Sequence, residues 1–324
     1  MRISENRAVL DPLRHLEPFP LEARLYPLGY PLEIATNDPR VVEGARESWG
    51  LFPPEFDVRP LRMHVAVAPR AGAASLRPPV FRAQRHLLSI VASAENFAVC
   101  DLDAGFSYCW LAEEAASGMA WMRYHFLEAI VYVSLTHAYF TPIHAACLAR
   151  NGKGVLLCAP SGTGKTVLSY TCARAGWTFI SDDVSFLVRG SERRMVLGRP
   201  YSFRFKASAA ELFPEFKDKP VIADANGQKL VEVGSEASAG VHTATCCRVD
   251  HLVFLERGEN ARSELRPMTS RGALERMLAE IPHYQDHVRE EQRASLERLV
   301  SAPVHRLIYR SLQEGLDLLN TLTE

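Results

Sequence analysis

The sequence has no long apolar run, no excess of one charge and no cysteine spacing typical of a metal site. Its most apolar stretch, residues 126–135, is interrupted by Glu128 and is too short to span a bilayer. The first residues lack the apolar core of a signal peptide. The formal net charge is −1 without a block of like charge, so we expect neither a nucleic-acid nor a membrane partner. The seven cysteines are expected to be buried free thiols in a reducing cytoplasm.

What is present is typical of a globular protein: 324 residues, 47% apolar and 23% charged, with room for two domains. Residues 1–60 are rich in proline and turn residues and show no long helical period. Strand-like alternation follows in 61–69, 86–93 and 96–103, and helical spacing in 120–137. We therefore expect a mixed, β-rich N-terminal lobe over residues 1–125, with a role in substrate recognition left open, and a second domain over residues 126–324.

The second domain begins with a predicted β-hairpin. Residues 143–150 and 154–160 read as strands, and Asn151-Gly152 between them tolerates the positive φ angles of a tight turn. A helix is expected over 165–175, ended by a left-handed cap at Gly176. Residues 177–188 read as an apolar strand interrupted by two carboxylates. Further strands and a closing helix, capped by Ser311, make the predicted fold class α/β, mixed with α+β features.

A glycine-rich loop joins the second strand of the hairpin to the helix. It fits the phosphate-loop pattern Gly-x4-Gly-Lys-Ser/Thr, with Ala159 in place of the first glycine. Glycines let the backbone N–H groups point at phosphate oxygens, and the helix start adds its positive end. Lys165 would reach the β- and γ-phosphates and the Thr166 hydroxyl would bind Mg²⁺. The predicted nucleotide-binding residues are Ser161, Gly162, Thr163, Gly164, Lys165 and Thr166.

Asp182 and Asp183 follow the loop at a distance that leaves room for one helix and one strand. A pair of carboxylates suits phosphoryl transfer, because one can hold Mg²⁺ while the other accepts the proton of an attacking hydroxyl. Successive strand residues point to opposite faces, so both can serve only if the strand ends there. We assign Asp182 as the base and Asp183, with Thr166, to the metal.

Residues 143–183 resemble the catalytic core of HPr kinase/phosphorylase and its relatives, a family that shares its nucleotide-binding fold with phosphoenolpyruvate carboxykinase. The resemblance rests on His144 opening the hairpin, the Ser-Gly-x-Gly-Lys-Thr loop, Gly176 and the aspartate pair. It implies that His144 lies near the phosphates or metal, that Lys165 and Thr166 hold phosphate and Mg²⁺, and that the aspartates supply metal binding and acid–base chemistry for transfer to a serine.

The sequence differs from the usual HPr kinase pattern in two places. Val167 stands where HPr kinases usually carry glutamate, and their later glycine-rich signature has no clear counterpart. The better match is therefore to HPr-kinase-related proteins of other settings, including peptide-modification pathways.

Further candidates lie in residues 201–206 and at two histidines. In residues 201–206, aromatic and polar residues alternate, so Lys206 would lie on the outer face with Arg204 and stabilise transferring charge. The alternative is a half-exposed strand with a basic outer row. His283 and His287 are four residues apart and are expected as a surface pair.

We therefore expect an ATP- and Mg²⁺-dependent kinase that phosphorylates a hydroxyl, most simply a serine of a peptide or protein. The predicted catalytic residues are His144, Lys165, Asp182, Asp183 and Lys206. Two alternatives stay open at this point: a kinase of the same fold that acts on a small molecule, and a non-catalytic ATP-binding regulatory protein. The sequence leaves the oligomeric state open, a homo-oligomer included.

Overall fold

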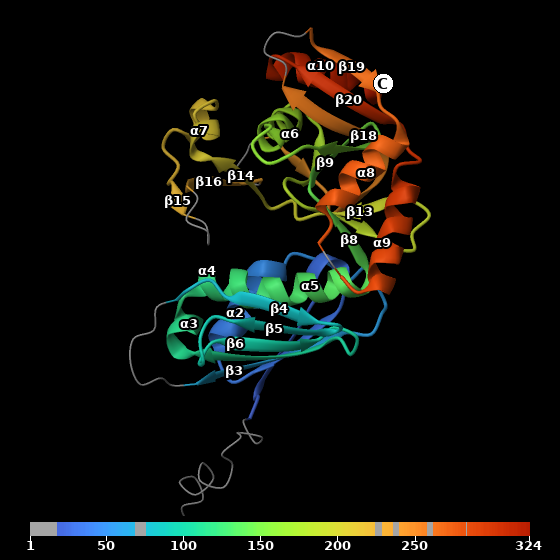
Figure 1. Cartoon of the computed structure of the whole chain (residues 1–324). Coiled ribbons are helices and arrows are strands. Elements are labelled where there is room, and N and C mark those ends of the chain that lie inside the picture. The colour runs from blue at the N-terminus through green and yellow to red at the C-terminus, as the bar shows by residue number, and fades with distance from the viewer. Residues whose placement is uncertain (1–17, 69–75, 224–228, 236–239, 258–261, 283) are drawn as a thin grey trace, which may run out of the picture. The chain divides into compact units, whose positions relative to one another are not determined.

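The computed structural model describes residues 18–68, 76–223, 229–235, 240–257, 262–282 and 284–324 (Figure 1). The chain divides into two compact units, Met1–Ser134 and Leu135–Glu324. Both units combine helices with mixed sheets, as the predicted fold class requires. Whether residues 1–125 and 126–324 are separate folding domains stays a prediction.

The first unit is built on a seven-stranded sheet with the order β1-β2-β3-β7-β6-β5-β4. The strands β2, β3 and β7 run parallel, and the other neighbours pair antiparallel. The strands predicted at 61–69, 86–93 and 96–103 are confirmed as β3, β5 and β6. The strand bounds are β1 Leu21–Leu25, β2 Leu32–Thr36, β3 Leu61–Ala68, β4 Val80–Gln84, β5 Leu87–Val91, β6 Phe97–Asp101 and β7 Phe106–Ala112.

A helix that the sequence reading missed, α2 (Pro39–Trp49), lies within the first 60 residues. Asp38 caps it by accepting a hydrogen bond from the Arg40 N–H at 2.9 Å, and Pro39 occupies the first turn, where its missing N–H costs nothing. The helix is short, so a search for a long helical period passed over it. Its Gly44 packs closely against the side chain of Met119 in α4.

The helix predicted over 120–137 is confirmed as a run of consecutive helical segments. It consists of α4 (Met119–Met122), a π-helical stretch η2 (Arg123–Glu128) and α5 (Ala129–Ala138). The short α3 (Glu113–Ser117) precedes it, and a 3₁₀ turn, η1 (Pro27–Gly29), joins β1 to β2. The border between the two units falls inside α5.

The second unit is built on a ten-stranded sheet. Its main path has the order β17-β11-β9-β10-β18-β13-β12-β8, and β20 joins β18 and β19. At its centre β10, β18 and β20 run parallel. The strand bounds are β8 Phe140–Ile143, β9 Ala145–Arg150, β10 Lys153–Cys158, β11 Thr178–Ser181, β12 Ser185–Val188, β13 Met195–Leu197, β17 His242–Thr243, β18 Cys246–Arg257, β19 Glu264–Pro267 and β20 Val304–Tyr309.

Helices cover both faces of this sheet. Because strand side chains alternate, Val155 and Leu157 of β10 join the core beneath α6 (Lys165–Arg174) and α10 (Leu312–Leu322). Leu156 and Cys158 join the core beneath α8 (Ser270–Glu280) and α9 (Asp286–Leu299). The central strands are thus buried on both faces, as parallel strands usually are.

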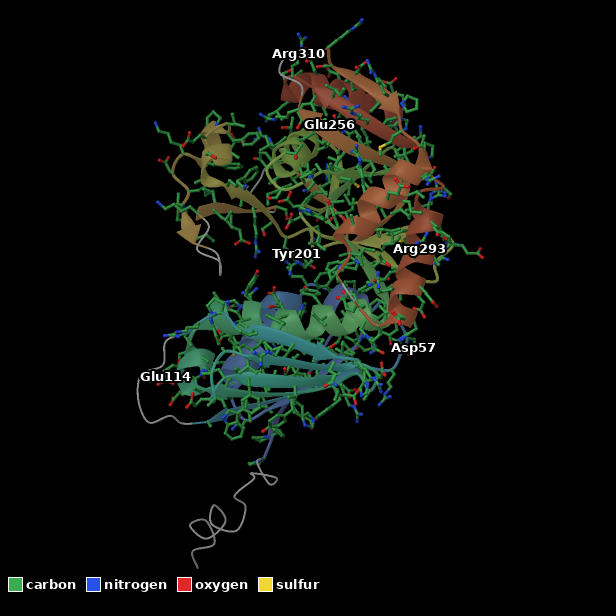
Figure 2. All side chains as sticks on the ribbon, viewed as in Figure 1. Asp57, Glu114, Tyr201, Glu256, Arg293 and Arg310 are labelled. Carbon is green, nitrogen blue, oxygen red and sulfur yellow. The ribbon has the colours of Figure 1, made fainter. Side chains whose placement is uncertain are left out.

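A small three-stranded sheet, β14-β16-β15, lies beside α6 (Figure 1). Its strands are β14 Ser202–Lys206, β15 Ile222–Ala223 and β16 Lys229–Gly234, with α7 (Ala207–Ala210) and the 3₁₀ turn η3 (Pro214–Phe216) between β14 and β15. The alternation expected in residues 201–206 is confirmed for β14, because Phe203 and Phe205 are fully buried while Arg204 and Lys206 are exposed. Tyr201, labelled in Figure 2, precedes the strand.

Other expectations have mixed outcomes. The closing helix is confirmed as α10, where the Ser311 hydroxyl accepts from the Glu314 N–H. All seven cysteines are free, but Cys246 is exposed and Cys247 half-buried, because both lie at the start of β18, so the expectation of buried thiols is wrong there. Within the described ranges, every helix is too short or too polar to cross a bilayer. His283 lies outside the described residues.

Candidate active site

The predicted hairpin and loop form at the carboxyl end of β10. The strands β9 and β10 pair antiparallel, and Asn151 and Gly152 join them with φ angles of 51° and 75°. The loop that follows β10 turns through Gly162 and Gly164, whose φ values of 85° and 103° are strained for any residue with a Cβ. Helix α6 then starts at Lys165. This strand, loop and helix are the setting in which a phosphate loop works.

Lys165 is largely buried, and its amine folds back over the loop. Its Nζ donates to the Ala159 carbonyl oxygen at 2.5 Å and lies 3.0 Å from the His144 Nε2. Burial lowers the pKa of Lys165, and the nearby carboxylates of Asp183 and Glu280 oppose that effect. A buried amine whose hydrogen-bond partners are a carbonyl oxygen and an imidazole is well suited to receive an anionic ligand.

His144 lies between three charged groups. Its Nε2 lies 3.1 Å from the Asp183 Oδ1 as well as close to the Lys165 amine, and its Nδ1 lies 3.7 Å from the Glu280 Oε2. A hydrogen on Nε2 donates to Asp183, whereas the free lone pair accepts from Lys165, so the ring makes one of these two contacts at a time. The proton position on His144 is thereby linked to both partners.

Asp182 and Asp183 are adjacent but differ in surroundings, because β11 ends at Ser181 and β12 does not begin until Ser185. The expectation that the strand ends at the pair is confirmed, and residues 177–188 form two strands with different partners. The Asp182 residue is only 7% exposed, whereas the Asp183 side chain is 73% exposed.

Asp182 lies below the loop. Its carboxylate accepts from the Ser169 hydroxyl at 3.3 Å and from the Arg204 N–H at 3.2 Å, and it also bonds the Thr166 hydroxyl. Burial raises the pKa of Asp182 to about 6, although these hydrogen bonds act in the opposite direction. For Asp183 the hydrogen bond from His144 is the main cause that lowers the pKa, and Lys165 and Arg204 add to the effect.

Three more polar side chains approach the loop. A Cβ built on Gly162 would lie 3.6 Å from the Lys206 amine, so this predicted residue does reach the loop. A Cβ on Gly164 would lie 3.2 Å from the Tyr309 hydroxyl and 3.6 Å from the Arg257 guanidinium. Arg257 hydrogen-bonds Tyr309, whose hydroxyl lies 3.5 Å from the Thr163 carbonyl oxygen.

Sequence reasoning missed Arg257, Tyr309 and Glu280. Arg257 ends β18 and Tyr309 ends β20, the two strands parallel to β10, and carboxyl ends of parallel strands share one edge of a sheet. The polar residue at the end of each of these two strands was a signal in the sequence that could have pointed to the site. The order of the strands, which brings these ends beside the loop, is not written in any local pattern.

The residues present fit a nucleotide with a divalent cation. Positive-φ glycines, a helix start and the Lys165 amine suit phosphate oxygens, with Lys206 and Arg257 close by. The Thr166 hydroxyl and the Asp182 carboxylate are the hard oxygen donors that Mg²⁺ prefers. Burial raises the pKa of Asp182, and a cation bound beside the carboxylate would stabilise its charged form.

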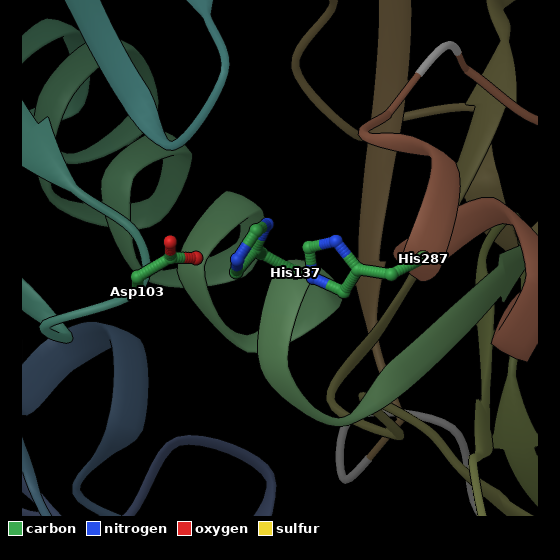
Figure 3. Close-up of side chains that lie close together, drawn as sticks. All are labelled: Asp103, His137 and His287. Atoms are coloured by element: carbon green, nitrogen blue, oxygen red, sulfur yellow. The ribbon is translucent and has the colours of Figure 1, made fainter.

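A second group of candidate side chains lies away from the loop. His137 of α5 and His287 of α9 meet edge to face, with ring centroids 5.8 Å apart (Figure 3). His287 therefore contacts another helix and is not simply one half of a surface pair. Asp103, also drawn there, belongs to the first unit.

Comparisons with known proteins give one family match. The model of "SynChlorMet cassette protein ScmC" matches residues 107–199, a stretch that contains His144, the phosphate loop and both aspartates. No curated protein matches the chain. Among solved structures, the HPr(Ser) kinase/phosphatase from Coxiella burnetii is similar at 11% identity, with a TM-score of 0.32, over 56% of this chain and 90% of that one. A likeness of this size does not establish a shared fold.

Proposed function

We propose that the protein is an ATP- and Mg²⁺-dependent kinase that phosphorylates a hydroxyl, most simply a serine of a peptide or protein. The observation that carries this proposal is the arrangement at the end of β10. A phosphate loop, a buried carboxylate bonded to the loop threonine, and an exposed carboxylate beside His144 and Lys165 lie at one site. The exposed carboxylate, held by His144 beside the loop, can accept a proton from an attacking hydroxyl, which favours transfer over binding alone.

The reaction divides among residues as follows. Bound ATP would supply the phosphoryl group, and Mg²⁺ held by Thr166 and Asp182 would neutralise charge on its phosphates. The acceptor oxygen forms a bond to the terminal phosphorus, the bond from that phosphorus to the bridging oxygen of ADP breaks, and the acceptor proton passes to a carboxylate. Lys165 holds the phosphates and stabilises the charge that moves toward the bridging oxygen.

The two aspartates have different parts in this proposal. Asp182 is buried and bonded to Thr166, so it holds the metal side of the site with that hydroxyl. Asp183 is exposed, so an acceptor can reach it, and His144 orients its carboxylate. Sequence reasoning assigned the base to Asp182 and the metal to Asp183, and the burial of the two side chains favours the reverse.

The name of the matched family points to a class of acceptor. Its name describes a cassette protein. Peptides and proteins encoded beside this gene are therefore the first acceptors to test. We propose them ahead of small-molecule hydroxyls.

The test is intact-mass spectrometry of such peptides after incubation with the protein, ATP and Mg²⁺. We expect a gain of one HPO₃ unit on a serine, which disappears when that serine is replaced by alanine and with the Lys165→Ala variant. Phosphate on a metabolite but on no peptide would establish the small-molecule alternative. ATP binding without transfer or hydrolysis would establish the regulatory alternative.

A further inference from the structure

A cavity of about 310 Å³ lies beside the proposed site within the second unit. It is enclosed by the end of β8, the end of β10, β18 and the helices α8 and α9. Its walls are mainly apolar, with Ile143, Phe254, Met277 and Leu296 among the lining side chains. The volume is near the lower limit of about 300 Å³ for ligand pockets, so the cavity has room for one side chain or a small group.

The cavity adjoins the phosphate loop at one particular end. His144 and the first loop residues, Ala159 and Pro160, line it. The Lys165 amine contacts both His144 and the Ala159 carbonyl, and in a phosphate loop this amine marks the β- and γ-phosphates. Lys206 and Arg257 approach the loop at Gly162 and Gly164, and neither is among the described residues that line the cavity. The cavity thus adjoins the part of the loop where the Lys165 amine lies, which is where a terminal phosphate would meet its acceptor.

Charged groups at the cavity are already engaged with one another. The Glu280 carboxylate lies 3.7 Å from His144, and the Arg276 guanidinium lies 3.8 Å from Glu256 (labelled in Figure 2) and over the Phe254 ring. The rest of the cavity wall is apolar, and such a wall favours an apolar ligand.

We propose that this cavity binds an apolar side chain next to the acceptor hydroxyl, so that the enzyme selects serines flanked by residues such as leucine or methionine. The inference rests on the proposed function and names its substrate class more closely. Full burial of a leucine side chain corresponds to a preference of about 10- to 100-fold over glycine at the same position.

The variant that tests this is Ala279→Phe, since Ala279 is an exposed residue of α8 that lines the cavity, and a ring there would fill the space without disturbing the core. Glu275→Phe is the matched control, because Glu275 is exposed on the same helix and does not line the cavity. Ala279→Leu, a smaller filling group, provides a second variant if the phenylalanine impairs folding, which circular dichroism would show.

The first measurement is saturation-transfer NMR with the capped dipeptides acetyl-Ala-Leu-amide and acetyl-Leu-Ala-amide, which cannot accept phosphate. We expect saturation of the leucine methyl groups by the wild type and by Glu275→Phe, and its loss with Ala279→Phe. Equal saturation in all three proteins, or none in any, would overturn the proposal.

The second measurement compares kcat/KM for serine peptides that differ only in a flanking leucine or glycine. We expect the leucine peptide to be preferred by about 10- to 100-fold and the preference to vanish in Ala279→Phe with ATP affinity unchanged. Equal rates on both peptides would overturn the inference while leaving the kinase assignment intact. Methyl saturation without transfer to either peptide would support the cavity and contradict the peptide-kinase assignment.

Discussion

The two units differ in how polar side chains are bonded at their most polar positions. In the first unit such groups bind the main chain: the Thr36 hydroxyl donates to the Val65 carbonyl oxygen at 2.7 Å, and the Asn96 side chain accepts from the Ala112 N–H at 2.9 Å. In the second unit the polar side chains near the loop bind one another, as Lys165, His144 and Asp183 do, as well as main-chain groups such as the Ala159 carbonyl oxygen.

This difference distinguishes polar side chains that support the fold from those that can bind a ligand. A side chain that satisfies a buried main-chain group supports the fold, because loss of the bond leaves that group unpaired. Charged side chains that are bonded to one another can exchange these bonds for bonds to a ligand. Burial shifts the pKa values of Lys165 and Asp182, and the His144 hydrogen bond shifts that of Asp183. Mutations in the two units should therefore affect different measurements, stability in the first and transfer in the second.

The largest expected effect is on transfer. Lys165→Ala removes the amine that holds the phosphates, and we expect kcat/KM to fall by about 100- to 1,000-fold, the usual loss for one group that stabilises transition-state charge. Thermal unfolding monitored by circular dichroism should change much less than transfer, because the lost bond to the Ala159 carbonyl oxygen is offset by removal of a cation that burial disfavours. A rate within a few-fold of wild type would show that the loop does not act in catalysis.

The next effect is on the stability of the first unit. Asn96→Ala leaves the buried Ala112 N–H without its acceptor, and we expect a loss of about 1–3 kcal/mol in the free energy of unfolding. Gln84→Ala, which removes an exposed side-chain amide of the same unit, is the control and should be nearly neutral. Transfer by the folded Asn96→Ala protein should be unchanged. An unaltered urea midpoint for Asn96→Ala would contradict the distinction drawn between the units.

Replacing Asp182 or Asp183 by asparagine should change the free energy of unfolding in opposite directions. Because the folded protein raises the pKa of Asp182 from 3.8 to about 6, the charge on Asp182 destabilises the fold above that pH. Without Mg²⁺ at pH 8, Asp182→Asn should therefore raise the free energy of unfolding of the second unit. The net gain should be about 1–2 kcal/mol, because the loss of one hydrogen bond offsets part of the gain from removing the charge. At pH 4, where the Asp182 carboxyl is already neutral in the folded protein, the gain should be absent.

Asp183→Asn is the matched variant. Its lowered pKa means that the charged form stabilises the fold above the unfolded pKa, and that this contribution is lost as the pH falls through the folded value. Asp183→Asn should thus be less stable than wild type at pH 8, and the difference should shrink in acid. Urea unfolding across this pH range measures both variants, and equal signs at pH 8 would contradict the contrast between the two carboxylates.

The smallest expected effect concerns the exposed amine of Lys206, which approaches the loop at Gly162. Lys206→Ala should weaken ATP binding about 3- to 10-fold, in line with the modest value of exposed charge pairs. Lys217→Ala is the control, because it removes the same charge from an exposed lysine that directly follows η3. Calorimetric titration with ATP checks both, and equal affinities would remove Lys206 from the site.

Local patterns were enough to predict much of the second unit. The hairpin at Asn151-Gly152, the loop, α6 with its Gly176 end and the break at Asp182 depend on short-range chemistry, and each formed where expected. The missed helix α2 also carried local signals, Asp38 and Pro39, which a search for longer periods overlooked.

The remaining parts depend on strand order. Arg257 lies 93 residues and Tyr309 145 residues beyond Gly164 in the chain, and they meet the loop only because β18 and β20 run parallel to β10. Glu280 reaches His144 because α8 packs on the face of the sheet opposite α6. Asp182 and Asp183 differ in burial because β11 ends at Ser181, and the sequence alone did not predict which of the two would be buried.

The central claim is that the site gives its phosphoryl group to a hydroxyl and not to water. Its most direct test follows the label of [γ-³²P]ATP in a single turnover with Mg²⁺ and the serine peptides encoded beside the gene, using wild type and Asp183→Asn. The account predicts label on the peptide serine with wild type and a large loss of that label with Asp183→Asn. Label found only in inorganic phosphate, or peptide label unaffected by Asp183→Asn, would contradict it.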